Sequence, residues 1–280
     1  MAAEQKVWFI TGVSRGFGKV LTDHALANND IVIGTTRDGK ASFAGDTRNV
    51  QVLPLEVTDA AAIRATIAKA HALHGRLDVV INNAGYGLLG SVEEATEEQV
   101  NHLFEVNFHG TRRVVQAVLP FLRKQRSGHI LNITSIAGLA PAAGSGFYAA
   151  SKFAVEGFTQ SLAAEVAPLG IKVTLVEPGA FRTDFLSERS IRDASAEIAD
   201  YASTAGAMRA VLAKMAGKQI GDPLKAAAAI FRITREPQPP LHLVLGSDAL
   251  RRTREQQAQL AADLQRFEAF SLGTDYPKGT

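Results

Sequence analysis

The chain has 280 residues, of which 46% are hydrophobic and 21% are charged, and its formal net charge is +2. This balance excludes a disordered protein, which is poorer in apolar residues and richer in net charge. Thirty basic residues stand against 28 acidic ones without a long basic run, which excludes a nucleic-acid-binding surface. We interpret Arg251, Arg252 and Arg254 as the solvated start of a helix. The lack of cysteine excludes disulfides, thiolate zinc sites and cysteine nucleophiles.

The sequence shows neither a targeting signal nor a membrane-spanning segment. The first ten residues, MAAEQKVWFI, lack the long apolar segment that follows a basic start in a signal peptide. No apolar stretch reaches the roughly 20 residues needed to span a bilayer. We therefore expect a cytoplasmic protein that binds neither membranes nor nucleic acid.

Short β-rich runs alternate with longer segments of helical spacing along the chain. The expected strands are residues 7–10, 31–35, 50–55, 79–82, 129–133, 171–176 and 241–245. Helical spacing marks residues 19–27, 60–74, 100–122 and 153–166. The alternation predicts an α/β fold of the doubly wound Rossmann type, with a seven-stranded, mostly parallel sheet and helices on both faces. The strands are almost continuously hydrophobic, as expected when helices cover both faces.

Two segments depart from this alternation. Residues 181–221 carry no strand signal, and we predict a substrate lid there, with an irregular surface excursion as the alternative. The tail, about residues 247–280, is predicted to be a helical extension. Its apolar spacing indicates an amphipathic helix over 254–270, packed on the core or on another subunit. No linker or repeat divides the chain, so residues 1–280 are expected to form a single domain.

The first expected strand runs directly into a glycine-rich loop. Gly12, Gly16 and Gly18 let the backbone turn tightly and approach a ligand closely. The following helix offers free N–H groups and a partial positive charge to a pyrophosphate. A plain turn would use the same glycines, but the position after the first strand of a βαβ unit favours dinucleotide binding.

The end of the second strand bears on the choice of cofactor. An NAD site places an acidic residue about 20 residues past the glycines, and this chain has Thr36-Arg37-Asp38 there. Arg37, together with Arg15 of the glycine loop, suits the 2′-phosphate of NADP. One charge-assisted contact of roughly 1.5–3 kcal/mol gives about a 10- to 150-fold preference. Asp38 could instead hold the ribose hydroxyls of NAD. We predict NADP(H) in preference to NAD(H).

Tyr148 and Lys152 are four residues apart at the start of the helix after the fifth strand, so they share one helix face. An ammonium group about 4 Å from a phenol contributes about 4 kcal/mol at an effective dielectric of 20. That is roughly three pKa units, which would bring the phenol from about 10 to near 7. Burial opposes this shift, and a positively charged nicotinamide reinforces it. Ser135 ends the fifth strand and could hold a substrate oxygen against the tyrosine.

With these motifs the sequence resembles the short-chain dehydrogenase/reductase family, in its compact single-domain branch, over about residues 6–245. The matching motifs are Thr11-Gly-x-x-x-Gly16-x-Gly18, Asn82-Asn83-Ala84-Gly85, Asn107, Ser135, Tyr148-x-x-x-Lys152 and Pro178-Gly179, in family order. Residues 176–184 look most like the 17β-hydroxysteroid- and retinol-dehydrogenase-like members. The family usually has Asp-Val after its third strand, where this chain has Glu56-Val57. The adenine contact then passes to the longer side chain or to the Val57 backbone.

The resemblance implies a role for each matching residue. Tyr148 is the general acid in reduction and the general base in oxidation. Lys152 lowers its pKa and binds the nicotinamide ribose, and Ser135 orients the carbonyl. Asn107 anchors a water that continues the proton relay. The residues implied to contact the cofactor are Gly12, Ser14, Arg15, Gly16, Phe17, Gly18, Arg37, Glu56, Val57, Asn83, Ala84, Gly85, Tyr148, Lys152, Pro178, Gly179 and Thr183.

We therefore predict an NADP(H)-dependent oxidoreductase that moves a hydride between nicotinamide and a carbonyl or alcohol carbon of an apolar or aromatic small molecule. Residues 139–147 are expected to floor the substrate pocket, and Phe181, Phe185 and the lid to roof it. The alternatives are a non-catalytic NADPH-binding regulator and an isomerase or dehydratase using the same site. The histidines show no metal-binding pattern, so no metal site is predicted. The resemblance implies a homodimer or homotetramer formed through helices 100–122 and 153–166.

Overall fold

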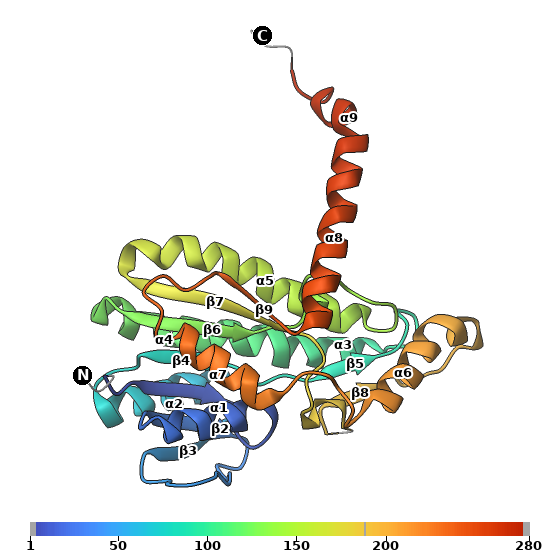
Figure 1. The fold of residues 1–280 in the computed structure, drawn as a ribbon. Coiled ribbons are helices and arrows are strands. Elements are labelled where there is room, and N and C mark those ends of the chain that lie inside the picture. The colour runs from blue at the N-terminus through green and yellow to red at the C-terminus, as the bar shows by residue number, and fades with distance from the viewer. Residues whose placement is uncertain (1–3, 188, 277–280) are drawn as a thin grey trace.

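A computed structural model describes residues 4–187 and 189–276, with a seven-stranded sheet between two layers of helices (Figure 1). The strands are β1 (Val7–Thr11), β2 (Ile31–Thr36), β3 (Val50–Pro54), β4 (Val79–Asn82), β6 (Gly128–Ile133), β7 (Ile171–Pro178) and β9 (His242–Leu245). Their order in the sheet is β3-β2-β1-β4-β6-β7-β9, and every neighbouring pair is parallel. The predicted Rossmann fold is confirmed. From β1 the chain adds strands first toward β3 and then, from β4 onward, toward β9, so the strand order reverses between β1 and β4.

Each face of the sheet has its own hydrophobic core. The covering helices are α1 (Gly16–Ala27), α2 (Ala60–His74), α4 (Thr111–Gln125), α5 (Gly146–Val166) and α7 (Pro223–Ile233). Alternate residues of β1 enter opposite cores, because side chains of a strand point to alternate faces. Phe9 packs with α2, α4 and α5, whereas Trp8 packs with α1 and α7, and both are fully buried. Burying a side chain of this size contributes about 1.5–3 kcal/mol to stability.

The helix predicted over residues 100–122 is longer and contains a local irregularity. It begins as α3 (Glu97–Phe104), where Thr96 and Gln99 form a reciprocal capping box, and continues into α4. A π-helical stretch, η1 (Glu105–Gly110), joins the two. Such a bulge turns side chains away from the regular helical spacing, and it contains Asn107.

Two other helices begin earlier than the apolar spacing indicated. Helix α1 starts at Gly16 rather than at residue 19, and α5 starts at Gly146 rather than at residue 153. Each missed start holds a single phenylalanine among glycine, alanine and polar residues, so it lacks the repeated apolar spacing on which the prediction relied. Tyr148 and Lys152 both lie within the opening turns of α5, as the sequence predicted from their spacing.

The segment 181–221 contains a strand, which corrects the prediction that it has none. Strand β8 (Ile191–Asp193) pairs in parallel with β5 (Gly87–Leu89), which was also not predicted. The segment also holds helix α6 (Ala207–Met215), while residue 188 lies outside the described residues. Its two ends are joined, because Arg182 N donates to Gly221 O and Gly221 N donates to Ala180 O, both at 2.9 Å.

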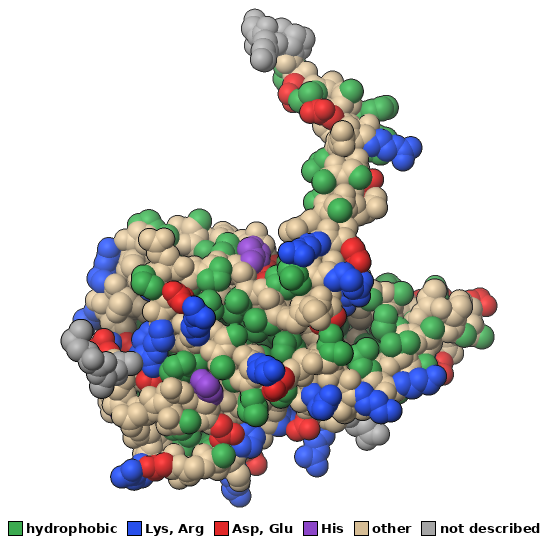
Figure 2. All heavy atoms as spheres, in the orientation of Figure 1, with side chains coloured by type: hydrophobic (Ala, Val, Ile, Leu, Met, Phe, Trp, Pro, Cys, Tyr) green, Lys and Arg blue, Asp and Glu red, His purple; other side chains and the backbone are tan. Residues whose placement is uncertain are grey.

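The C-terminal helices leave the body of the molecule (Figures 1 and 2). Helix α8 (Ser247–Arg266) begins before the predicted residue 254 and is followed by α9 (Glu268–Leu272). Its contact with the core is limited to its first two turns, where Ala249 and Thr253 are buried. Every described residue beyond Thr253 is exposed, and residues 277–280 of the predicted extension lie outside the described part of the chain. None of the described helices is long and apolar enough to cross a membrane.

Candidate active site

A cavity of about 710 Å³ opens at the carboxyl ends of the strands. This edge, next to the reversal of strand order, is where open α/β sheets bind ligands, and the volume suits a small-molecule site. Of the residues implied to contact the cofactor, all line the cavity except Gly18. Ser135, Tyr148 and Lys152 also line it, whereas Asn107 does not.

The glycine loop has the backbone that only glycine adopts readily. Gly12 and Gly16 have φ angles of 75° and 56°, in the left-handed region. A Cβ added to Gly12 would lie 3.2 Å from Asn83 Nδ2 and 3.3 Å from Ala84 Cα. A Cβ added to Gly18 would lie 2.1 Å from the Gly12 carbonyl oxygen. Gly18 therefore allows α1 to pack on the loop, which explains its position outside the cavity wall.

Arg15 of this loop bonds to the segment 181–221. Its Nε donates to Ser190 Oγ at 3.1 Å, and its Nη2 donates to the Arg189 carbonyl at 2.9 Å. Both partners also line the cavity. The guanidinium that the sequence suggested for a 2′-phosphate thus links the glycine loop to the opposite wall.

The turn after β2 separates the two candidate cofactor-selecting residues. Arg37 lines the cavity. The Asp38 carboxylate instead accepts from Lys40 N at 3.1 Å and from Thr36 Oγ1 at 3.0 Å. These hydrogen bonds, with that of Lys40 the stronger, lower the pKa of Asp38. Asp38 is therefore held within its own turn.

The residues after β3 also reach the cavity. Both Glu56 and Val57 line it, at the place where the family usually has Asp-Val. The Glu56 Oε1 accepts from Thr58 N at 3.1 Å, so the longer side chain folds back on its own loop. Val57 stays at the wall beside it.

The predicted catalytic residues converge, but their electrostatics differ from the expectation. Burial raises the pKa of the Tyr148 phenol to about 12, and the nearby Ser135 hydroxyl opposes this only in part. Lys152 Nζ lies 5.8 Å from the Tyr148 ring centroid and donates to the Ile133 carbonyl at 3.0 Å. Burial lowers the pKa of Lys152 to about 8, and the Glu156 charge opposes this. The expected fall of the Tyr148 pKa to near 7 is thus wrong for this structure, because burial dominates.

Asn107 supports the site from behind the cavity wall. Its Oδ1 accepts from Tyr86 N at 3.0 Å, and its Nδ2 donates to the Tyr86 carbonyl at 2.9 Å and to Ser151 Oγ at 3.1 Å. The Ser151 hydroxyl in turn donates to the Tyr148 carbonyl at 2.7 Å. Both ends of the Asn107 amide are therefore engaged in fixing the backbone around Tyr86 and Tyr148.

Phe185 and one helix of the segment 181–221 add apolar side chains to the cavity wall. The Phe185 ring lies 6.0 Å from the Tyr148 ring. Helix α6 contributes Met208, Val211, Leu212 and Met215. Of the expected floor, residues 139–147, Ala142 and Ser145 line the cavity. Phe181 and Phe185, the expected roof, both line it as well.

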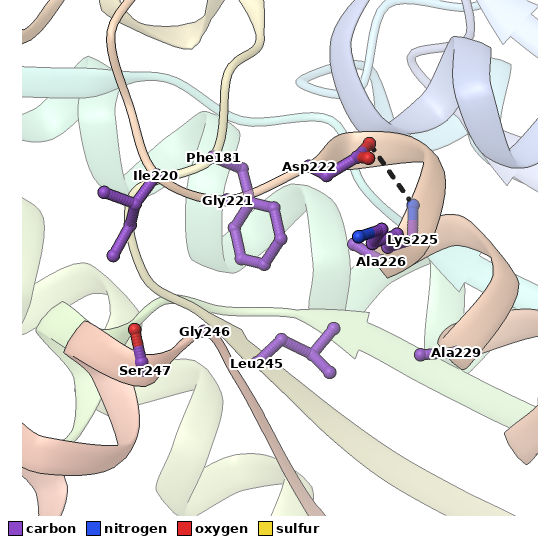
Figure 3. A pocket seen from close by; sticks show the side chains of 10 residues that line it. All are labelled: Phe181, Ile220, Gly221, Asp222, Lys225, Ala226, Ala229, Leu245, Gly246 and Ser247. Carbon is purple, nitrogen blue, oxygen red and sulfur yellow. Dashed lines mark hydrogen bonds between the residues drawn. The ribbon is translucent and has the colours of Figure 1, made fainter.

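Phe181 also anchors the base of the segment 181–221. Figure 3 shows its ring between Ile220 and the start of α7, in a second cavity of about 290 Å³. The ring packs edge-on against Phe17, with centroids 5.3 Å apart. On the same wall, Asp222 caps α7 by accepting from Leu224 N at 2.9 Å.

A buried carboxylate clamps the middle of the same segment to the body. Glu94 accepts from Ser91 N at 2.7 Å, from Ile198 N at 2.9 Å and from Arg209 Nη1 at 3.0 Å. The Arg209 guanidinium, followed by the two backbone donors, lowers the pKa of Glu94 to about 2. The segment is therefore fixed both at its base and above the cavity.

Several cavity residues were missed by sequence reasoning. Arg251, Arg252 and Arg254 do lie at the start of α8, where Arg251 and Arg254 are exposed as predicted, but Arg251 and Arg252 also line the cavity. Arg252 is half-buried and donates to the Ala140 carbonyl. Arg192 lies 4.7 Å above the Tyr86 ring. The sequence did offer a signal for Arg251 and Arg252. A helix that follows the last parallel strand, as α8 follows β9, begins at the ligand-binding edge of the sheet.

The family model of short chain dehydrogenases matches residues 6–194. The chain is 38% identical over 243 residues to the 3-ketodihydrosphingosine reductase of Bacteroides thetaiotaomicron, covering 87% of this chain and 88% of that protein. A solved short-chain dehydrogenase from Streptomyces avermitilis is 40% identical with a TM-score of 0.89, covering 96% of this chain and 100% of its own. The chain belongs to the short-chain dehydrogenase/reductase family. It is an oxidoreductase of the class that acts on CH–OH groups with a nicotinamide cofactor.

Solved neighbours hold either form of that cofactor. ElxO, described with NADP bound, is 28% identical with a TM-score of 0.71, covering 88% of this chain and 99% of its own. A Burkholderia phymatum protein in complex with NAD is 21% identical with a TM-score of 0.73, a likeness of fold alone, covering 100% of this chain and 99% of its own. A nicotinamide dinucleotide is thus the supported cofactor class.

Proposed function

We propose that the protein interconverts a carbonyl and an alcohol on an apolar or aromatic small molecule, with NADP(H) in preference to NAD(H). The observation that carries this proposal is the convergence of Ser135, Tyr148 and Lys152 on one cavity with the glycine loop. Ser135 follows β6, Tyr148 and Lys152 lie on α5, and the loop follows β1, so only the assembled sheet edge brings them together.

The cavity fits a nicotinamide dinucleotide. The left-handed backbone at Gly12 and Gly16 opens the loop at the N-terminus of α1, where a pyrophosphate is stabilised by free N–H groups. A Cβ added to Gly85 would lie 3.1 Å from Asn107 Oδ1 and 3.6 Å from Lys152 Nζ. Glycine at this position therefore leaves the space beside the lysine open. Pro178, Gly179 and Thr183 continue the same wall.

The chain's own residues manage the proton. A nicotinamide bound here supplies or accepts the hydride. In reduction, the phenolic O–H of Tyr148 breaks and its proton goes to the carbonyl oxygen, which becomes the alcohol. The high pKa of Tyr148 keeps the phenol protonated at neutral pH and so prepares it for reduction. The Ser135 hydroxyl holds the same oxygen, and the Lys152 ammonium stabilises the phenolate that forms.

The preference for NADP(H) rests on the turn after β2. Arg37 lines the cavity, and Asp38 is engaged by Thr36 and Lys40. A 2′-phosphate there would meet a guanidinium rather than a carboxylate. The NADP-bound state described for ElxO supports the same direction.

The substrate class follows from the wall around Tyr148. The Phe185 ring lies beside Tyr148, and the apolar side chains of α6 line the same cavity. Apolar groups are stabilised there by removal from water. The name of the Bacteroides relative, a 3-ketodihydrosphingosine reductase, supports a ketone as substrate.

The organisation of the chain is part of the proposal. We take residues 1–280 as one domain, with residues 181–221 as the substrate lid and 247–280 as a helical extension. The joined ends of the lid and its clamp at Glu94 support this division. Assembly is proposed to be a homodimer or homotetramer through α4 and α5, where Phe153 is 46% exposed. A light-scattering mass near 29.8 kDa would reject oligomers.

The test is NADPH consumption with a panel of apolar and aromatic ketones and aldehydes. We expect consumption with formation of an equal amount of alcohol. Binding of NADPH without consumption across the panel would favour a regulator. Conversion of substrate without net change in NADPH would favour an isomerase or dehydratase.

A further inference from the structure

One turn beyond Lys152 on α5, Glu156 meets Glu177 of β7 and His242 of β9. Their ligand atoms all lie within 4.8 Å of one another. His242 Nδ1 is 2.5 Å from Glu177 Oε1 and 3.9 Å from Glu156 Oε2. The two glutamates are buried, whereas the histidine side chain is 41% exposed. This group, the Glu156–Glu177–His242 cluster, connects solvent to the interior beside the candidate active site.

The cluster is tied to the backbone that carries the candidate catalytic serine. The Thr134 hydroxyl donates to Glu156 Oε1 at 2.6 Å, and Lys152 Nζ donates to the Ile133 carbonyl at 3.0 Å. Glu156 and Lys152 thus hold adjacent residues at the end of β6, immediately before Ser135. A Cβ added to Gly138 would lie 3.1 Å from Glu156 Cγ and 3.3 Å from the Lys152 carbonyl carbon, which shows how closely the two residues pack there.

Protons are needed to make this arrangement stable. Glu156 Oε2 and Glu177 Oε2 are both buried and lack a hydrogen-bond partner among the described residues. Two such carboxylates are costly to ionise together, because each is desolvated and each repels the other. Burial raises the pKa of Glu177 to about 8. Burial, reinforced by the Glu177 charge, raises the pKa of Glu156 to about 7.

We propose that the Glu156–Glu177–His242 cluster shares protons and sets the charge of Lys152, so that Glu156 is a positioning residue for the reaction. Besides the Thr134 hydroxyl, three titratable groups act on the Glu156 charge: Glu177 on β7, His242 on β9 and Lys152 on α5. An ionised Glu156 holds the proton on Lys152, and a protonated Glu156 allows Lys152 to lose its proton more readily. Solvent exchanges protons with the cluster at His242, so no other reactant is required. The catalytic consequence rests on the proposed function, whereas the charge coupling does not.

The test measures the protonation of Lys152 directly in the full chain. The pKa is followed by NMR of ¹³Cε-labelled lysine, with Lys152→Arg assigning the signal. Glu156→Gln should lower the Lys152 pKa by about one unit, a tenfold change in its protonation equilibrium. Glu177→Gln should raise it, because Glu156 then ionises at lower pH. Glu165→Gln, an exposed position on the same helix, should leave it unchanged.

The Lys152 pKa is expected to fall in Glu156→Gln and to rise in Glu177→Gln, and this difference in direction distinguishes charge coupling from a loss of packing. General loosening of the interior would hydrate Lys152 and shift its pKa the same way in both glutamine variants. Equal signs, or an unmoved Lys152 pKa in Glu156→Gln, would overturn the proposal. If Glu156→Gln does not fold, His242→Gln provides the test at a partly exposed site. It removes the imidazole that contacts Glu177 and shares the cluster's protons, so the Lys152 pKa should move from its wild-type value; an unmoved Lys152 pKa would overturn the proposal.

The same three side chains also have the spacing of a divalent-cation site, and cation binding is the alternative to proton sharing that the next measurement tests. The direct contact between His242 and Glu177 favours a shared proton. Melting temperature is therefore measured with added Zn²⁺ and with EDTA, and no change is expected. A Zn²⁺-dependent rise that Glu156→Gln abolishes would overturn proton sharing. Because the NMR titration needs no turnover, the expected pKa shifts in a protein that consumes no NADPH would reject the proposed function alone.

Discussion

Replacing Arg37 with glutamine should weaken NADPH binding selectively. The side chain lines the cavity at the end of β2, and the neighbouring Asp38 carboxylate is bound within its own turn. A charge-assisted hydrogen bond to a phosphate contributes about 1.5–3 kcal/mol. Loss of one such contact corresponds to about a 10- to 150-fold rise in the Kd for NADPH. NADH lacks the phosphate, so its Kd should remain within about twofold of the wild-type value.

The assay is a parallel titration of wild type and variant with NADPH and NADH, followed by nicotinamide fluorescence. Asp38→Asn is the matched control, since it removes the neighbouring charge without touching the guanidinium. We expect this control to retain wild-type or slightly tighter NADPH binding. Equal weakening of both cofactors in Arg37→Gln would show a general loss of the site. Unchanged NADPH binding would refute a phosphate role for Arg37.

Three further predictions concern the proton, the lid base and the lid clamp. Because burial raises the pKa of Tyr148 to about 12, alcohol oxidation should accelerate with rising pH while carbonyl reduction does not; initial rates in both directions across pH test this. A Cβ at Gly221 would lie 2.5 Å from the Phe181 ring, so Gly221→Ala should destabilise the protein by about 1–3 kcal/mol, visible in chemical denaturation. Glu94→Gln removes the charge that binds the lid, so proteolysis within residues 181–221 should quicken and KM should rise; unchanged cleavage would argue against a clamp.

The sheet was predictable because buried parallel strands are continuously apolar. Helix α2 was predicted with its observed bounds, since its apolar face lies between the Asp59 cap and the left-handed Gly75. Strands β5 and β8 were not predictable in this way. Each has three residues, too few for a periodic pattern, and each is stabilised by a partner about 100 positions away along the chain.

Some residues of the candidate site could be predicted from the sequence, and others depend on the packed structure. Residues in loops after strands, such as Ser135 and Arg37, could be assigned to one edge of the sheet because parallel strands bring all such loops there, and both line the cavity. The position of Asn107 depends on a π-helical stretch, and that of Arg252 on the rotation of α8, neither of which spacing determines. The pKa of Tyr148 depends on the depth of burial, which only the packed structure provides.

The most direct test of the account is the turnover of Tyr148→Phe with NADPH and a ketone that the wild type reduces. The change removes one hydroxyl and leaves the ring that packs beside Phe185. General acid catalysis contributes about 10²- to 10⁴-fold, so kcat should fall by at least that factor. The Kd for NADPH should stay near the wild-type value. Turnover close to wild type would contradict the assignment of Tyr148 as the proton donor, and with it the proposed chemistry of the site.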